Sequence, residues 1–180
     1  MRVLLFLSFI LVGFLNPVQA QPTKSKGPVI KNYGAVYAIG QTDFKVAKTE
    51  VLKVVFDVGR SFENKSKPNP LIETAARFLN LHAQHDYDTE KLQVALVIHG
   101  EATNDLLNHN VYKAKYKTAN PNASLIKELH QAGVEIVVCG QSAAYRNITK
   151  KEALPEIKWA LSAMTALVHL QNINYRLIKF

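Results

Sequence analysis

Cysteine is almost absent from this sequence: Cys139 is the only one in 180 residues. One thiol cannot close an intramolecular disulfide, so Cys139 is a buried thiol, an intermolecular link or a reactive group. Glycine-rich phosphate loops are missing as well, because neither GxGxxG nor GxxxxGK occurs. The GxSxG motif of serine hydrolases is also missing. We therefore predict neither a nucleotide cofactor nor a serine nucleophile.

Runs of one charge and clusters of metal ligands are lacking too. The formal net charge is +8, but the lysines are scattered and never form a basic run of five or six residues. We therefore expect no nucleic-acid partner. His82 and His85 have no cysteine or second close pair beside them, so we expect no metal site. No cofactor of any kind is predicted.

Long apolar runs are confined to the beginning of the chain. Arg2 precedes an uncharged apolar run, residues 3–14, and residues 16–20 then offer a helix break and small residues. This order is typical of a secretory signal peptide, here residues 1–20, cleaved after Ala20. The run is too short to span a bilayer comfortably, and no later stretch is long enough. We expect a periplasmic or secreted protein without a membrane span after cleavage.

The rest of the chain divides into an arm, residues 21–50, and one domain, residues 51–180. The arm begins as a loose polar leader, and residues 35–39 are a possible edge strand. Apolar and β-branched runs predict four buried strands, at 51–58, 92–100, 134–139 and 175–180. Helical patterns fall at 70–84, 101–107, 111–116, 120–130, 141–147 and 156–170. This alternation predicts a three-layer α/β fold: a mostly parallel sheet of four to five strands with helices on both faces.

The predicted closing helix, residues 156–170, is unusually apolar. We expect it to turn five side chains inward: Ile157, Leu161, Met164, Leu167 and Val168. Much of its remaining surface is also apolar. A helix with so little polar surface is usually covered on more than one side, which predicts an oligomer.

Cys139 ends the third predicted strand, and Gly140 follows at once. Open α/β sheets bind their ligands at the carboxyl ends of their strands. Unpaired amides at the start of the next helix would lower the pKa of the thiol and favour the nucleophilic thiolate. Gly140 leaves the backbone free to approach a bound anion. The alternative is a buried cysteine that only fills the edge of the sheet.

His99 and Gly100 end the neighbouring strand, so we expect them at the same edge of the sheet as Cys139. An imidazole there can hold a proton, pair with a thiolate or bind an anion, or it can be a histidine bonded to a loop carbonyl. The candidate site has Cys139 as its reactive group and, as binding residues, His99, Gly100, Gly140, Gln141 and Ser142.

Several of these segments together resemble the DsrE/DsrF-like family, in particular its exported members. They are His99-Gly100, Asn120-Pro121-Asn122, Gly133-Val134, Val138 to Ser142, Tyr145 to Ile148, Leu161 to Leu167, and Tyr175. The similarity covers roughly residues 53–180. It implies a compact three-layer α/β fold that assembles as trimers or hexamers. In the sulfur-relay members, a cysteine after the third core strand carries a persulfide between proteins, and Cys139 falls at the matching position.

The resemblance therefore implies an exported sulfur carrier that uses one cysteine persulfide and meets a sulfur donor or acceptor protein. Any enzymatic activity would be limited to sulfur transfer. The alternative is a non-enzymatic module that binds a small ligand or forms an oligomeric interface, with a structural cysteine.

Overall fold

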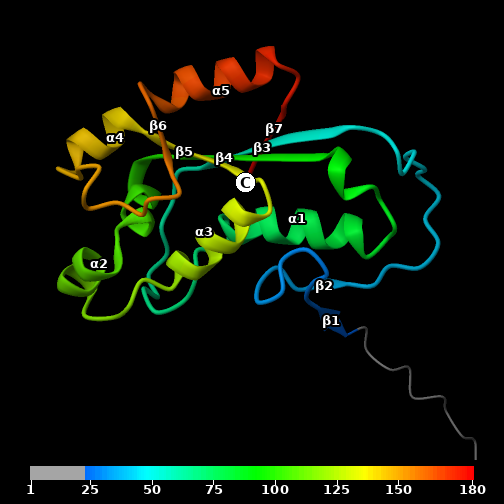
Figure 1. Cartoon of the computed structure of the whole chain (residues 1–180), viewed down its shortest axis with the longest axis horizontal. Coiled ribbons are helices and arrows are strands. Elements are labelled where there is room, and N and C mark those ends of the chain that lie inside the picture. The colour runs from blue at the N-terminus through cyan, green and yellow to red at the C-terminus, as the bar shows by residue number, and fades with distance from the viewer. Residues whose placement is uncertain (1–22) are drawn as a thin grey trace, which may run out of the picture.

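The computed structural model describes residues 23–180, and a five-stranded parallel sheet lies at its centre (Figure 1). The predicted signal peptide, residues 1–20, lies outside the described residues. The order across the sheet is β6-β5-β4-β3-β7, and every neighbouring pair is parallel. The strands are β3 (Leu52–Val58), β4 (Leu92–Ile98), β5 (Glu135–Cys139), β6 (Lys158–Ala160) and β7 (Arg176–Lys179).

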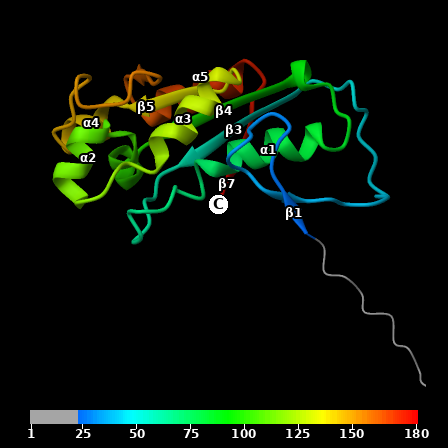
Figure 2. The same cartoon turned by 60° about the horizontal axis from the view of Figure 1, so that its bottom comes forward.

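Helices cover both faces of this sheet, which confirms the predicted three-layer α/β fold. Figure 1 shows α1 and α3 on one face and α5 on the other, and Figure 2 shows α2 and α4 together at one end of the molecule. The helices are α1 (Glu73–Ala83), α2 (His109–Tyr116), α3 (Asn122–Gln131), α4 (Gly140–Tyr145) and α5 (Ala163–Asn172). Short 3₁₀ helices are η1 (Thr89–Lys91) and η2 (Gly100–Leu106).

Alternate residues of each central strand face opposite helix layers. Val54 and Phe56 of β3 pack with α1 and α3, whereas Val55 packs with Ala166 and Leu170 of α5. Burial on both faces requires apolar side chains in both directions, which explains why β3, β4 and β5 read as continuous apolar runs. The same alternation turns odd-numbered positions of β3, β4 and β5 towards α5, a point on which the site depends.

The predicted helix 156–170 is wrong at its start. Residues 158–160 form β6, which pairs with β5 from Val137 to Cys139, and α5 begins only at Ala163. The side chain of Ser162 accepts a hydrogen bond from the Thr165 N–H, so Ser162 is the N-cap of α5. A serine at this position is a strong helix-start signal. The sequence-based prediction gave more weight to the apolar spacing through residues 157–161 than to this serine, and so began the helix too early.

The later start also changes which face of α5 is buried. Ala166 and Leu170 are its buried residues, with Ala163 and Leu167 packed beside them. Of the side chains predicted to point inward, Leu161 is 74% exposed, Met164 75% and Val168 57%. Met164 and Val168 expose apolar surface on α5, and Leu161 does so just before its N-cap; we call these three residues the α5 face.

The arm is held against α1 and does not join the main sheet. Its strands β1 (Lys24–Ser25) and β2 (Val36–Tyr37) pair antiparallel with each other, so the fifth strand of the main sheet is β6 and not residues 35–39. The fully buried amide of Asn80 accepts from the Ile30 N–H at 2.8 Å. It also donates to the carbonyls of Ile30, Tyr33 and Gly34. Ile30 of the arm is buried in the core at 1% exposure, and Val29 and Tyr33 pack against the same core cluster.

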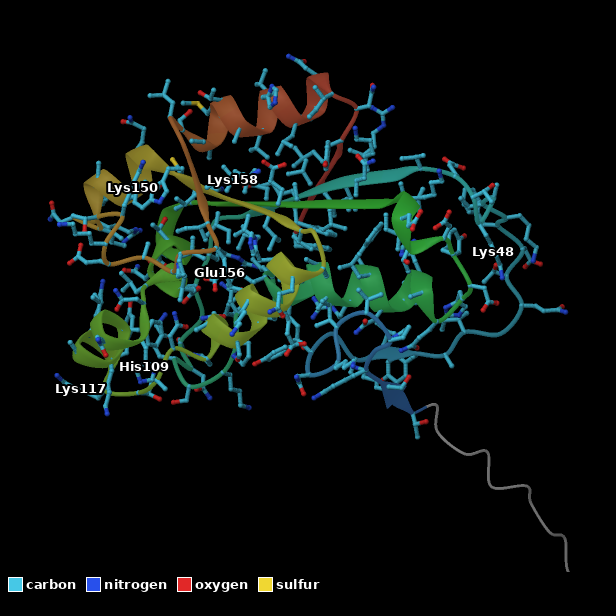
Figure 3. The ribbon with its side chains drawn as sticks, viewed as in Figure 1. Lys48, His109, Lys117, Lys150, Glu156 and Lys158 are labelled. Carbon is cyan, nitrogen blue, oxygen red and sulfur yellow. The ribbon has the colours of Figure 1, made fainter. Side chains whose placement is uncertain are left out.

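Two further features concern the surface. Lys48, Lys117 and Lys150 lie in widely separated parts of the molecule, so the positive charge is spread out (Figure 3). Within residues 23–180, none of the helices combines the length and apolar character that a membrane crossing requires.

Candidate functional site

Cys139 is both the last residue of β5 and the N-cap of α4. Its side chain is buried, at 5% exposure, and its sulfur accepts the backbone N–H of Ser142 at 3.4 Å. The end of β6 crosses directly over Gly140, because a Cβ on Gly140 would lie 2.7 Å from the carbonyl oxygen of Ala160. Gly140 is therefore required for close packing, which brings the start of α5 to the sulfur.

Several donors surround the Cys139 sulfur and lower its pKa. Burial alone would raise the pKa of this thiol. The Ser142 hydroxyl and the backbone N–H groups of Ser142, Ala163 and Gln141 outweigh burial, so the pKa lies below its ordinary value. Gln141 and Ser142 belong to the first turn of α4 and Ala163 to the first turn of α5. The sulfur therefore lies between two helix starts, both of which favour negative charge.

Ser142 also links the ends of β4 and β5. The Gly100 N–H donates to the Ser142 Oγ at 3.0 Å. Because this oxygen accepts there, the hydroxyl proton remains available to the sulfur. Arg146 fixes the same glycine by donating from Nε to its carbonyl oxygen at 2.7 Å. Gly100 itself has φ +52°, and a Cβ on it would lie 2.6 Å from the carbonyl oxygen of Gly59, so another residue would be strained there.

The backbone of His99 lies beside that of Cys139 at the ends of the neighbouring strands β4 and β5, but the His99 ring points away from the sulfur. Ile98 pairs with Val138, so one further step along each chain brings His99 beside Cys139, about 4.8 Å between strands. The ring instead contacts the other neighbour, β3, where Nε2 lies 2.5 Å from Oδ1 of Asp57. Lys179 of β7 reaches the second oxygen of the same carboxylate at 3.0 Å. The expected contact between His99 and a sulfur anion is therefore not made in this arrangement.

Asp57 is a functional candidate that the sequence analysis missed. Its side chain is 5% exposed. Burial alone would raise the pKa of its carboxyl group, but the hydrogen bonds and positive charges of Lys179 and His99 bring the pKa below its ordinary value. The available signal was an acidic residue near the carboxyl end of the largely apolar β3, whose other charged residue, Lys53, lies near its beginning. A buried carboxylate of this kind is almost always paired.

The structure thus divides the predicted site residues between two places. Cys139, Gly140, Gln141, Ser142 and Gly100 gather around the sulfur. His99 instead lines a separate cavity of about 220 Å³ at the ends of β3, β4 and β7, and Cys139 is not among the residues that line it. No group of three or more histidine, cysteine or acidic side chains suited to a metal ion occurs in residues 23–180.

Two solved structures share this fold at low sequence identity. One is a protein of unknown function, MTH1491, from Methanobacterium thermoautotrophicum, with a TM-score of 0.54 and 16% identity, covering 72% of this chain and 99% of the other. The second is the ychN protein from E. coli, with a TM-score of 0.52 and 12% identity, covering 72% of this chain and 99% of the other. No curated protein gives a significant sequence match.

The model of the DsrE/DsrF-like family matches residues 53–180, which begin within β3 and include every strand of the main sheet after it. The match contains both the surroundings of Cys139 and the pair formed by Asp57 and His99. Because it extends over well more than half of the sequence, this chain belongs to the DsrE/DsrF-like family.

Proposed function

We propose that this protein carries sulfur as a persulfide on Cys139. In the loading step, the thiolate attacks the outer sulfur of a persulfide or thiosulfate donor. A new S–S bond forms at Cys139 as the S–S bond of the donor breaks, and a thiolate or sulfite leaves with the bonding electrons. In the unloading step, an acceptor thiolate attacks the outer sulfur and Cys139 leaves as thiolate. The sulfur is exchanged between thiols, so no external oxidant or reductant is needed.

One observation carries this proposal: donors from α4 and α5 converge on a single sulfur and lower its pKa. The thiolate is the nucleophilic form of cysteine, so a lower pKa increases the reactive fraction near neutral pH. The same N–H groups provide a positive potential for a persulfide anion, which also carries negative charge. Membership of a family with sulfur-relay proteins supports the same chemistry.

The proposal places the protein outside the cytoplasm and in an oligomer. The order of residues 1–20, a positive charge followed by an apolar run and small residues, supports export and cleavage after Ala20. The exposed α5 face supports self-association, because Leu161 and Met164 lie on the surface of the single chain. The family resemblance favours trimers or hexamers as the form that this self-association takes. Both residues also flank Ala163, the first residue of α5, whose backbone N–H contributes to lowering the pKa of Cys139.

A structural role for Cys139 is the second candidate, and it rests on burial. At 5% exposure the sulfur is nearly covered, and its hydrogen bond with the Ser142 N–H caps α4. In that case the protein is a non-enzymatic binding or interaction module. The two candidates differ in one measurable property, namely whether the folded protein loads sulfur at Cys139.

Mass spectrometry of the intact protein tests the loading step. After incubation with polysulfide and removal of the excess, the wild type should gain the mass of one sulfur atom, and dithiothreitol should remove it. Cys139→Ser is the control that cannot gain it. If wild type and Cys139→Ser show the same mass, while alkylation still labels Cys139 in the wild type, the carrier function is excluded and the structural role is favoured.

A further inference from the structure

Ser142 and Arg146 lie one helical turn apart on α4. The Arg146 backbone N–H donates to the Ser142 carbonyl oxygen at 3.2 Å, which closes the turn between them. Side chains at this spacing of four residues lie on the same face of a helix. Both side chains are half-buried, and both bond to the backbone of one residue on another element, Gly100 at the start of η2.

Both polar groups of the Gly100 backbone are contacted by this face of α4. Its N–H donates to Ser142 Oγ at 3.0 Å, and its carbonyl oxygen accepts from Arg146 Nε at 2.7 Å. The N–H of the same peptide group as that carbonyl, which belongs to Glu101, donates to the Gly59 carbonyl oxygen at 3.1 Å. A glycine backbone has more freedom than that of any other residue, so its peptide groups keep one direction only when they are held. We call the two contacts from α4 the Gly100 clamp.

The Gly100 clamp sets the direction of the Ser142 hydroxyl. A serine hydroxyl has a single proton to donate and accepts through its oxygen. Because the Gly100 N–H donates to that oxygen, the proton is left for the Cys139 sulfur. Burial raises the pKa of the Cys139 thiol, and this hydroxyl is the largest of the contributions that lower it.

The bond to Gly100 is the one hydrogen bond that the Arg146 side chain makes within residues 23–180. Arg146 also takes part in none of the ion pairs in this part of the chain. Its guanidinium carbon lies 5.9 Å from the centroid of the Tyr145 ring, but Tyr145 is 84% exposed. The contact that connects Arg146 to the interior is therefore the one with Gly100.

We propose that Arg146 is a positioning residue for Cys139, because it fixes the Gly100 carbonyl and thereby keeps the Gly100 N–H on the hydroxyl that contacts the sulfur. Arg146 is not itself among the groups that bond to the sulfur. Loss of its bond frees the glycine peptide to turn, and the Ser142 hydroxyl then loses its orientation. This role rests on the proposed sulfur transfer, since the orientation of a hydroxyl matters for reactivity only at a thiol that acts as a nucleophile.

Two substitutions separate the hydrogen bond of Arg146 from its charge. Arg146→Gln removes the charge but keeps an N–H donor at the same number of bonds from Cα as Nε. Arg146→Met has a similar length and removes both the charge and the donor. The midpoint pH of Cys139 alkylation by iodoacetamide should rise by about 0.5–1 pH unit in Arg146→Met, the equivalent of one hydrogen bond. It should stay near the wild-type value in Arg146→Gln. Equal midpoints in the two variants would overturn the proposal.

A double substitution tests whether Arg146 acts through Ser142. In the Ser142→Ala protein, Arg146→Met should add no further rise, because the hydroxyl that it positions is already missing. A further rise as large as in the wild-type background would overturn the proposal. Lys150→Met is the control for charge: Lys150 follows α4, is exposed and takes part in no ion pair within residues 23–180. Its midpoint should equal that of the wild type.

Hydrogen exchange at the Gly100 amide tests the clamp without the thiol. In the Cys139→Ser protein, Arg146→Met should make this amide exchange faster, and Arg146→Gln should leave its rate near that of the parent. An unchanged rate in Arg146→Met, or equal alkylation midpoints in Arg146→Met and the wild type, would overturn the proposal. Failure of polysulfide to load Cys139, with the midpoints and exchange rates as expected, would exclude the carrier function and leave the positioning role standing.

Discussion

Ser142 is the side chain on which the state of the Cys139 sulfur depends most directly. Its Oγ accepts from Gly100 at 3.0 Å, and its hydroxyl and backbone N–H both stabilise the thiolate. Removal of the hydroxyl by Ser142→Ala should therefore raise the pKa of Cys139 towards its ordinary value. The pH dependence of iodoacetamide alkylation measures this, and the midpoint should move to higher pH.

Gln141→Ala is the control for that measurement. The Gln141 side chain is exposed, and the group that contacts the sulfur is its backbone N–H, which the substitution keeps. The alkylation midpoint should stay at the wild-type pH. Equal midpoints in Ser142→Ala and wild type would show that the hydroxyl does not stabilise the thiolate.

Asp57 makes the stability of the fold depend on pH. Its pKa is lower in the folded protein than in the unfolded chain. A lowered pKa stabilises the fold above the unfolded pKa of about 3.9, and this stabilisation is lost as the pH falls through the folded pKa. Asp57→Asn should cost about 2 kcal/mol in the free energy of unfolding at pH 7, the range for hydrogen bonds to charged groups. The cost should shrink below about pH 4.

Urea unfolding from pH 7 to pH 3 measures that difference. The free energy curves of wild type and Asp57→Asn should approach each other at the acid end. Curves that remain parallel over the whole range would show that the Asp57 carboxylate makes no net contribution through its ionised form.

At the level of elements, the central strands could be predicted from sequence and the edge could not. The predicted strands 51–58, 92–100, 134–139 and 175–180 match β3, β4, β5 and β7 within two residues at each end. Burial on both faces gives these strands long apolar runs, except β7, whose four residues are all exposed. β6 has only three residues, Lys158, Trp159 and Ala160, and its identity as a strand depends on pairing with β5. A strand of three residues is too short to show the alternation of apolar residues by which a strand is predicted from sequence.

The candidate site could likewise be predicted only in part from the sequence. The position of Cys139 at a strand end followed from the apolar run before it. The partner of His99 did not, because the order of strands across a sheet is set by tertiary packing, and only that order brings β3 and β7 to one side of β4. The contribution of Ala163 to the sulfur was also hidden, because it required the correct start of α5.

The arm and α1 depend on each other through Asn80, which is fully buried and bonds to three arm residues. Asn80→Ala should leave the Ile30 N–H and the arm carbonyls unpaired, at a cost of about 2–3 kcal/mol for buried polar groups. Trypsin should then cleave after Lys24, Lys26 and Lys31 faster than in the wild type, as seen by mass spectrometry over time.

Gln171→Ala is a suitable comparison, because that exposed amide bonds only to the Leu167 carbonyl of its own helix. It should be cleaved at the wild-type rate. An Asn80→Ala protein as resistant to trypsin as the wild type would show that the remaining contacts of the arm, among them the buried side chain of Ile30 and the bond from the Gly34 N–H to Glu73, suffice to hold it.

For the whole molecule, we expect the α5 face to decide the state of assembly. Leu161, Met164 and Val168 expose apolar surface on a single chain, and covering it with another copy would remove that surface from water. We expect light scattering at micromolar concentration to give the mass of a trimer or hexamer. Met164→Lys should lower that mass and leave the circular dichroism spectrum unchanged, because the side chain is 75% exposed.

Phe44→Lys serves as the comparison for an exposed apolar residue elsewhere. Phe44 is 85% exposed on the connection between β2 and β3 and lines a pocket with Leu81 and His82 of α1, on the other face of the sheet from α5. Its substitution should leave the mass unchanged. A wild-type protein that scatters light as a monomer would exclude self-association through α5.

The crossing of residues 160–161 over Gly140 has a kinetic consequence for any chemistry at Cys139. The chain that crosses over Gly140, the residue after Cys139, is the end of β6, the shortest strand of the main sheet and one of its two edge strands. Edge strands of this kind fray more readily than central strands. A bulky reagent would reach Cys139 only when this edge strand opens, so its reaction rate would be limited by that opening, whereas a small reagent would react without it. Reaction rates compared across reagents of increasing size would therefore report how often the edge strand opens, and hydrogen exchange at Trp159 would report the same event independently.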